Sequence, residues 1–347
     1  MSTFLYAFEA VMPVVLLIFL GYFLRRIGFL NEMFISVGYK FSFRVALPCM
    51  LFCNVYAIES FSAIDFRTVL YAMIAILVIF SLGVAAALIF VPDRRQRGVI
   101  AQCFFRSNSA IVGITLTEAL GGASALQCVS VLTAFTIPLY NVLAVISLSA
   151  FCDDGENREK RGRFHLLRSV NWKKIGLNIL KNPLIIAIAL GFVCLGIRAF
   201  IPVDAGGEKV FLLSKQLGVI YSVISSVGRI ASPFMMIILG GQFVFSAVKG
   251  MRLQIILGTV GRILIAPILA IGVAYLLSAA GVLDLGRAEY ASYIAQFASP
   301  VAVSSAIMAR EMGNDEVLAG QLVVWTSVGS MITVFLYAVL LRSLGLM

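Results

Sequence analysis

Two short polar stretches lie inside otherwise apolar segments, and their residue types could bind a ligand. Serine and asparagine side chains compete for backbone hydrogen bonds, and proline removes a backbone donor. A helix interrupted in this way presents unpaired N–H groups and a partial positive charge where its second half begins, which suits an anion. The alternative is that the small residues only allow close helix packing. The residues are Arg106, Ser107, Asn108, Ser109 and Gly113 in the first stretch and Ser299, Pro300 and Ser304 in the second.

Three arginines, Arg44, Arg106 and Arg229, lie roughly nine to twelve residues inside apolar segments, hence about 14–18 Å deep. A charge at that depth is costly and normally faces a cavity or a partner. All 17 acidic residues lie in loops or toward segment ends, so a mobile anion would complete the charge balance. The alternative is that these guanidinium groups reach an interface or cap carbonyl groups at a helix break. All three are therefore candidate substrate-binding residues.

Catalytic signatures are missing from the sequence. It contains no HExxH, GxSxG or GxxxxGK[ST] pattern, and no carboxylate pair lies inside an apolar segment. The single histidine, His165, lies in a polar connection. The six cysteines form no CxxC pair, which argues against a zinc site or a disulfide framework. We therefore expect no enzyme activity, no cofactor and no metal site.

The composition is that of a membrane protein. Hydrophobic residues make up 61% of the 347 residues and charged residues only 13%, whereas a soluble domain is about half apolar and about a quarter charged. Apolar windows of about 20 residues recur along the chain, the length that crosses a bilayer. The net charge of +10 arises from basic residues in short loops between these windows, so it does not indicate nucleic-acid binding.

We predict an all-α polytopic membrane protein with ten transmembrane helices. Because each half contains five spans, an odd number, the second half must enter the membrane from the opposite side. The polar stretches interrupt spans 4 and 9. The ten spans are 4–24, 35–55, 68–91, 97–120, 124–151, 183–199, 218–243, 253–279, 289–310 and 317–341.

Three sequence echoes indicate that the two halves are repeats. Their offsets grow from 170 to 185 to 194 residues, as expected of one duplicated unit with lengthened loops. We therefore expect a first five-helix repeat over 1–152, a cytoplasmic connecting loop over 153–182 and a second, inverted repeat over 183–347. The echoes pair Pro13 with Pro183, Arg44 to Pro48 with Arg229 to Pro233, and Ala101-Gln102 with Ala295-Gln296.

The distribution of lysine and arginine predicts the orientation. If the N-terminus is outside, the inner loops hold 16 basic residues and the outer loops six. Because basic loops stay on the cytoplasmic side, we expect both termini outside the cell membrane.

The chain resembles the auxin efflux carrier family of membrane transporters, in its prokaryotic type, over its whole length. The motifs that carry the resemblance keep their order along the sequence. They are Pro13 to Gly21 with Arg25-Arg26, Val45 to Pro48, Ser107-Asn108 to Gly113, Lys181 to Pro183, Ser232-Pro233 to Gly240-Gly241, Ser299-Pro300 with Val303 to Ser305, and Asp315 to Ala319.

The resemblance implies two inverted five-helix repeats in which broken helices 4 and 9 cross. Spans 1, 2, 6 and 7 would form a scaffold, and spans 3–5 and 8–10 a moving transport domain. It also implies organic carboxylate substrates such as malate, malonate or an auxin-like acid, and it is compatible with a homodimer. Many relatives have a proline after the glycine of span 4, where this chain has Ile114-Thr115. Span 4 is then either less sharply broken than in those relatives or broken around Ser107-Asn108.

These observations predict a secondary transporter of a small organic anion that works by alternating access in the lipid bilayer. One alternative is a sodium-coupled symporter of the bile-acid carrier type, with oxygen ligands from Gln102, Gln296, Asn141 and serines. Another is an anion channel or a membrane sensor.

Overall fold

The computed structural model describes residues 2–57, 66–109, 113–151, 177, 180–201, 212–243 and 245–347. Within these ranges the chain is helical with turns and short extended links, and it contains no β-strand. The predicted connecting loop 153–182 lies almost entirely outside the described residues.

The described part of the first half of the chain consists of six labelled α-helical elements and the π-helical turn η1. The label α6 covers two helices, because Gly122 has a non-helical backbone with φ 69° that ends one and starts the next. The elements are α1 (Ser2–Arg26), α2 (Glu32–Phe41), η1 (Ser42–Ala46), α3 (Leu47–Tyr56), α4 (Phe66–Phe90), α5 (Arg94–Phe105) and α6 (Ile114–Phe151).

The second half has the same character in its described part. Several of its elements are short and follow one another with little or no linker. They are α9 (Pro183–Phe200), α10 (Leu213–Gln216), α11 (Gly218–Gln242), η3 (Phe245–Gly250), α12 (Arg252–Val260), η4 (Gly261–Ile265), α13 (Ala266–Ala279), α14 (Arg287–Tyr293), η5 (Ile294–Ala298), α15 (Ser304–Glu311) and α16 (Glu316–Ser343).

Six helical segments among the described residues are long and apolar enough to cross a membrane. They agree with six of the predicted spans to within a few residues, so the prediction of an all-helical, multi-pass membrane protein is confirmed. The count of ten spans in two repeats goes beyond this finding and stays a prediction. The six segments are Glu32–Tyr56, Phe66–Phe90, Ser124–Phe151, Gly218–Gly241, Arg252–Ala279 and Glu316–Ser343.

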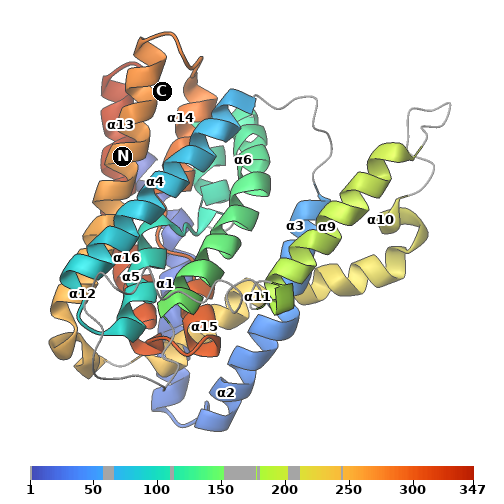
Figure 1. The fold of residues 1–347 in the computed structure, drawn as a ribbon, viewed down its shortest axis with the longest axis vertical. Coiled ribbons are helices and arrows are strands. Elements are labelled where there is room, and N and C mark those ends of the chain that lie inside the picture. The colour runs from blue at the N-terminus through green and yellow to red at the C-terminus, as the bar shows by residue number, and fades with distance from the viewer. Residues whose placement is uncertain are drawn as a thin grey trace.

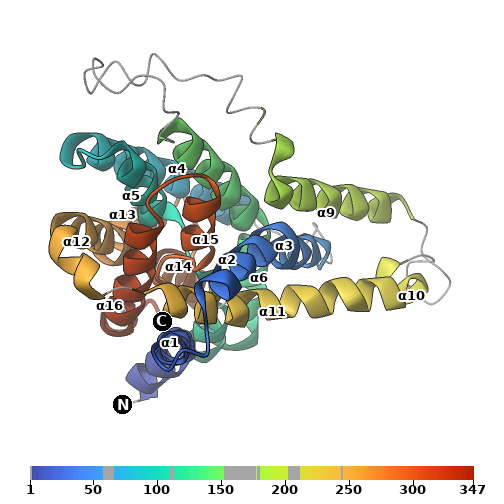
Figure 2. The ribbon, with the colours of Figure 1, turned by 90° about the horizontal axis from the view of Figure 1, so that it is seen from below.

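The helices form one large bundle from which α9 and the far part of α11 extend to one side, as both ribbon views show (Figures 1 and 2). Large apolar side chains such as Leu70, Ile268 and Ile332 are exposed on the outer helices. Apolar side chains on the outer face of a helix suit contact with lipid tails.

The crossing of α1 and α11 brings two backbones into contact. A Cβ atom on Gly21 would lie 2.0 Å from the carbonyl oxygen of Ile237, and one on Gly240 would lie 1.8 Å from that of Ile18. Only glycine fits at either position, because any larger residue would push the two helices apart.

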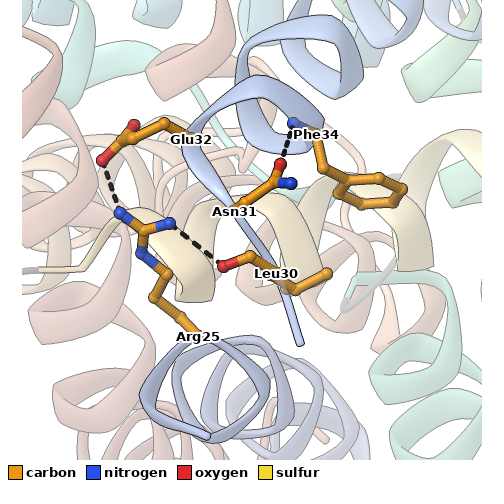
Figure 3. Close-up of polar contacts among 5 residues, drawn as sticks. All are labelled: Arg25, Leu30, Asn31, Glu32 and Phe34. Carbon is orange, nitrogen blue, oxygen red and sulfur yellow. Dashed lines mark hydrogen bonds and ion pairs between the residues drawn. The ribbon is translucent and has the colours of Figure 1, made fainter. Parts of the chain in front are cut away.

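The turn between α1 and α2 is fixed by polar contacts (Figure 3). The Asn31 side chain accepts a hydrogen bond of 2.8 Å from the Phe34 N–H and so caps the start of α2. Arg25 donates to the Leu30 carbonyl at 3.0 Å and pairs with Glu32 at 2.6 Å. These contacts set the angle at which the chain leaves α1.

Three of the described π-helical turns end two residues before a proline. η1 precedes Pro48, η4 precedes Pro267 and η5 precedes Pro300. A proline lacks the N–H that an α-helix needs, and its ring clashes with the carbonyl group four residues earlier, so a wider turn relieves the conflict. Arg44 lies in the first of these turns and Arg262 in the second.

Candidate functional site

The two polar stretches predicted from the sequence meet in space. α5 ends at Phe105, and Arg106 has an extended backbone with φ −79° and ψ 107°. The second helix ends with η5, after which Ser299 is likewise extended. The Asn108 N–H donates to the Pro300 carbonyl at 2.9 Å and the Ala302 N–H to the Arg106 carbonyl at 3.3 Å. The two broken helices therefore exchange backbone hydrogen bonds at their breaks.

The first break lies at Ser107, which forms an isolated antiparallel bridge with Val301. This is the position that the resemblance left open, because the chain has no proline after Gly113. The backbone groups of each extended segment form hydrogen bonds with the other segment. The break after α5 is therefore satisfied without a proline.

A cavity of about 50 Å³ lies against this crossing. A single water needs roughly 10–15 Å³ on the same measure, so the space suits a few waters or a small molecule. Among the described residues that line it, Arg106 is the only charged one. The lining consists of Leu47, Met50, Leu51, Asn54, Arg106, Ser107, Asn108, Ile137, Tyr140, Asn141, Met235, Ala302, Val303 and Ser304.

Arg106 is buried, with 3% of its surface exposed, and its partners are neutral. Its guanidinium group donates to the Asn141 side-chain oxygen at 3.0 Å and to the Ser304 hydroxyl at 2.9 Å, and it touches the sulfur of Met308. It forms no ion pair with any of the described residues. The positive charge beside the cavity is therefore held in place without being neutralised.

Two further polar groups at the cavity lack a partner. The Ser107 hydroxyl and the Asn108 side-chain nitrogen are buried and make no hydrogen bond with the described residues. Unsatisfied buried polar groups are rare, since each costs about 1–3 kcal/mol. Both residues line the cavity together with Arg106, so this wall contains three residues with donor groups that suit a carboxylate.

Four other predicted site residues lie behind the cavity. Ser109 and Ser299 are fully buried but do not line it. Pro300 contributes the carbonyl group that accepts from Asn108. Gly113 packs against Ala295, and a Cβ there would lie 3.0 Å from the Ala295 carbonyl oxygen. These residues shape the crossing of the chain, whereas Arg106, Ser107, Asn108 and Ser304 face the space.

The remaining two predicted residues, Arg44 and Arg229, lie apart from the cavity. Both are exposed on the outside of their helices and do not line it. Arg229 lies near Cys53 and Tyr221 instead. The structure therefore brings one of the three deep arginines, Arg106, to the candidate site.

Two polar residues of this region, Asn141 and Arg262, have a role that the sequence did not indicate. Asn141 orients Arg106, whereas the sequence suggested it only as a sodium ligand. Arg262 is fully buried beside the crossing, with 0% of its surface exposed. Each could have been singled out in the sequence as a polar side chain in the middle of an apolar span. Arg262, for example, is flanked by Gly261 and by Ile263 to Ile265.

The fold and the site together define a class of protein, a helical multi-pass membrane protein with a buried, positively charged cavity between broken helices. A family model described as "Membrane transport protein" matches residues 6–338, nearly the whole chain. The chain belongs to this family of membrane transporters, the auxin efflux carrier family, and the resemblance inferred from the motifs is confirmed. No curated protein matches it significantly.

Proposed function

We propose that the protein is a secondary transporter of a small organic anion, a carboxylate such as malate, malonate or an auxin-like acid. Membership of a transporter family supports the general class. The single observation that carries the choice of an anion is Arg106, a buried guanidinium group at a cavity whose described lining contains no acidic residue.

The electrostatics favour this choice. Two opposite charges 4 Å apart attract by about 4 kcal/mol at an effective dielectric constant of 20. A carboxylate in the cavity would gain this attraction and would also satisfy the unpaired groups of Ser107 and Asn108. A cation would meet repulsion from Arg106 instead. The charge of Arg106 therefore favours an anion over a cation at this site.

The substrate would be carried by alternating access between two inverted repeats of five helices. In this proposal spans 1, 2, 6 and 7 form the scaffold, and the crossing helices 4 and 9 move with the transport domain. The lining supports the division, since Leu47, Met50 and Leu51 of α3 and Met235 of α11 face the polar groups from the scaffold side. A shift of one body against the other would expose the cavity first on one side of the membrane and then on the other.

We place the protein in the cell membrane with both termini outside. The argument is the excess of lysine and arginine in the loops assigned to the cytoplasm. A homodimer and the identity of the carboxylate rest on family likeness alone.

The test is a thermal-shift screen of the purified protein against a panel of carboxylic acids, followed by uptake into proteoliposomes. A ligand of the folded state raises the apparent melting temperature. The wild type should respond to at least one acid, while Arg106→Gln and Asn108→Ala should lose the response and keep their fold. Arg252→Ala, an exposed arginine on α12, is the control and should respond like the wild type.

Each outcome of the uptake assay has a clear meaning. Saturable uptake of the acid that binds supports a transporter, and uptake that requires sodium indicates the symporter alternative. Saturable binding without flux would point to a sensor, and single-channel currents to a channel. Wild-type rates of uptake in both Arg106→Gln and Asn108→Ala would overturn the proposed site.

A further inference from the structure

Arg262 forms a dense set of hydrogen bonds between buried groups. Four of its five N–H groups are used. Its Nε donates to the Ser299 carbonyl at 2.9 Å, one terminal nitrogen donates to the carbonyls of Phe104 and Phe105 at 3.2 and 3.1 Å, and the other to that of Gln296 at 3.1 Å. The side chain therefore binds only backbone oxygens.

These four oxygens come from the ends of two different helices. Phe104 and Phe105 are the last residues of α5, and Gln296 and Ser299 lie in and just after η5. The last carbonyl groups of a helix have no partner within it, and they carry a partial negative charge. At the breaks, two such ends converge on one point, and the Arg262 guanidinium group occupies it.

No carboxylate takes part. Arg262 makes no ion pair with the residues that the structure describes, so the carbonyl groups alone compensate its charge. The ends of broken helices and unwound carbonyl groups are also the ligands that membrane transporters use to hold a sodium ion. The chemical environment of Arg262 is thus one in which a monovalent cation would bind.

The surrounding chain is shaped to bring the guanidinium group there. Arg262 belongs to the π-helical turn η4, and the residue before it is Gly261. A Cβ atom on Gly261 would lie 2.3 Å from the ring of Phe104, so a larger residue would force this buried ring to move away from η4. Arg262 also holds the carbonyl of Phe105, the residue next to Arg106, and so helps to fix the backbone at the cavity.

We propose that Arg262 is a built-in cation that joins the two broken helices and takes the place of a bound alkali ion. The carrier then holds its anion site in shape without sodium or potassium at this position. The part of the proposal that concerns anion binding rests on the proposed function, whereas the part that concerns the two helix ends stands without it.

The first test is chemical rescue of the purified protein in detergent. Arg262→Ala should lower the apparent melting temperature by about 5 °C or more, because four buried carbonyl groups lose their donor. Guanidinium chloride at millimolar concentration, far below its denaturing range, should restore at least half of the loss. Arg252→Ala, the same change ten residues earlier on an exposed arginine, should show neither loss nor rescue. An unchanged melting temperature for Arg262→Ala, or equal rescue of both variants, would overturn the proposal.

The second test uses the wild type, so it decides even if Arg262→Ala does not fold. Its melting temperature should be the same in sodium, potassium and choline chloride at equal ionic strength, and a rise specific to sodium or potassium contradicts the built-in cation. Any acid found to bind should do so with the same Kd, within about twofold, in all three salts. If no acid binds in any salt, the proposed function is wrong. The comparison of melting temperatures in the three salts still tests the role of Arg262 in that case.

Discussion

The guanidinium carbon of Arg310 lies 4.5 Å from the ring centroid of Tyr39, so that a cation rests on an aromatic face. Arg310 is near the end of α15, the short helix that begins at the cavity, and Tyr39 is in α2. Arg310 also pairs with Glu316 at 3.2 Å, at the start of α16. This cluster joins α2, on the predicted scaffold, to the two helices that follow the second break.

The first prediction is that this cluster holds the two bodies of the proposed transporter together on one side of the cavity. Tyr39→Leu removes the ring and should shift the equilibrium between closed and open forms by about 1–2 kcal/mol, a factor of roughly 5–30. With one spin label on α2 and one on α15, electron–electron double resonance should show a larger population at the longer of the two distances. Tyr39→Phe keeps the aromatic face and should resemble the wild type. If Tyr39→Leu leaves the distances unchanged, the cluster does not hold the two bodies together.

A second prediction concerns the helix crossing of α1 and α11. Gly240→Ala places a methyl group 1.8 Å from the Ile18 carbonyl oxygen and should destabilise the protein by about 1–3 kcal/mol, because the backbones must separate. Gly272→Ala, in α13, has nothing within 4 Å of the new Cβ. It should be neutral or stabilise by up to about 1 kcal/mol, since alanine is the better helix former. Thermal unfolding of both variants checks the prediction, which fails if they behave alike.

A third prediction follows from the close packing behind the cavity. Gly113→Val adds a branched side chain where even a Cβ would lie 3.0 Å from the Ala295 carbonyl oxygen and 3.2 Å from the Ala295 methyl group. The two broken helices would have to move apart at their crossing, so acid binding should weaken by tenfold or more. Isothermal titration measures the change. Gly250→Val, where nothing lies within 4 Å, is the matched control, and an equal effect in both would remove the packing argument.

Much of the fold could be predicted from composition and spacing. Apolar windows longer than 20 residues have few alternatives to a membrane helix, and six of those predicted agree with apolar helices of the structure. The breaks were predictable because the backbone-competing residues Ser107, Asn108, Ser299 and Pro300 fall near the middle of apolar spans. The sequence thus contained the local reasons for helix and for interruption.

The direction of each buried side chain could not be predicted in the same way. In a membrane both the lipid-facing and the core-facing sides of a helix are apolar, so hydrophobic periodicity does not tell which side an arginine takes. Depth alone therefore grouped Arg44 and Arg229 with Arg106, although only Arg106 reaches the cavity. Arg262 was passed over for the same reason, because its partners are backbone carbonyls and leave no mark on side-chain composition.

The last prediction tests the charge of the cavity directly. The Asn141 side-chain oxygen already accepts from Arg106 at 3.0 Å, so Asn141→Asp would place a carboxylate there with little change of shape. Asn141→Asp loses the 2.8 Å hydrogen bond that the Asn141 amide nitrogen donates to the Ile137 carbonyl, but the new ion pair with Arg106 should outweigh it and raise the melting temperature by a few degrees. Because this internal anion neutralises Arg106, acid binding should weaken by tenfold or more, about 1.4 kcal/mol. Asn141→Ser keeps the site neutral and should weaken binding less without raising stability. Thermal unfolding and isothermal titration measure both effects, and tighter binding of an acid by Asn141→Asp would show that the cavity does not select anions.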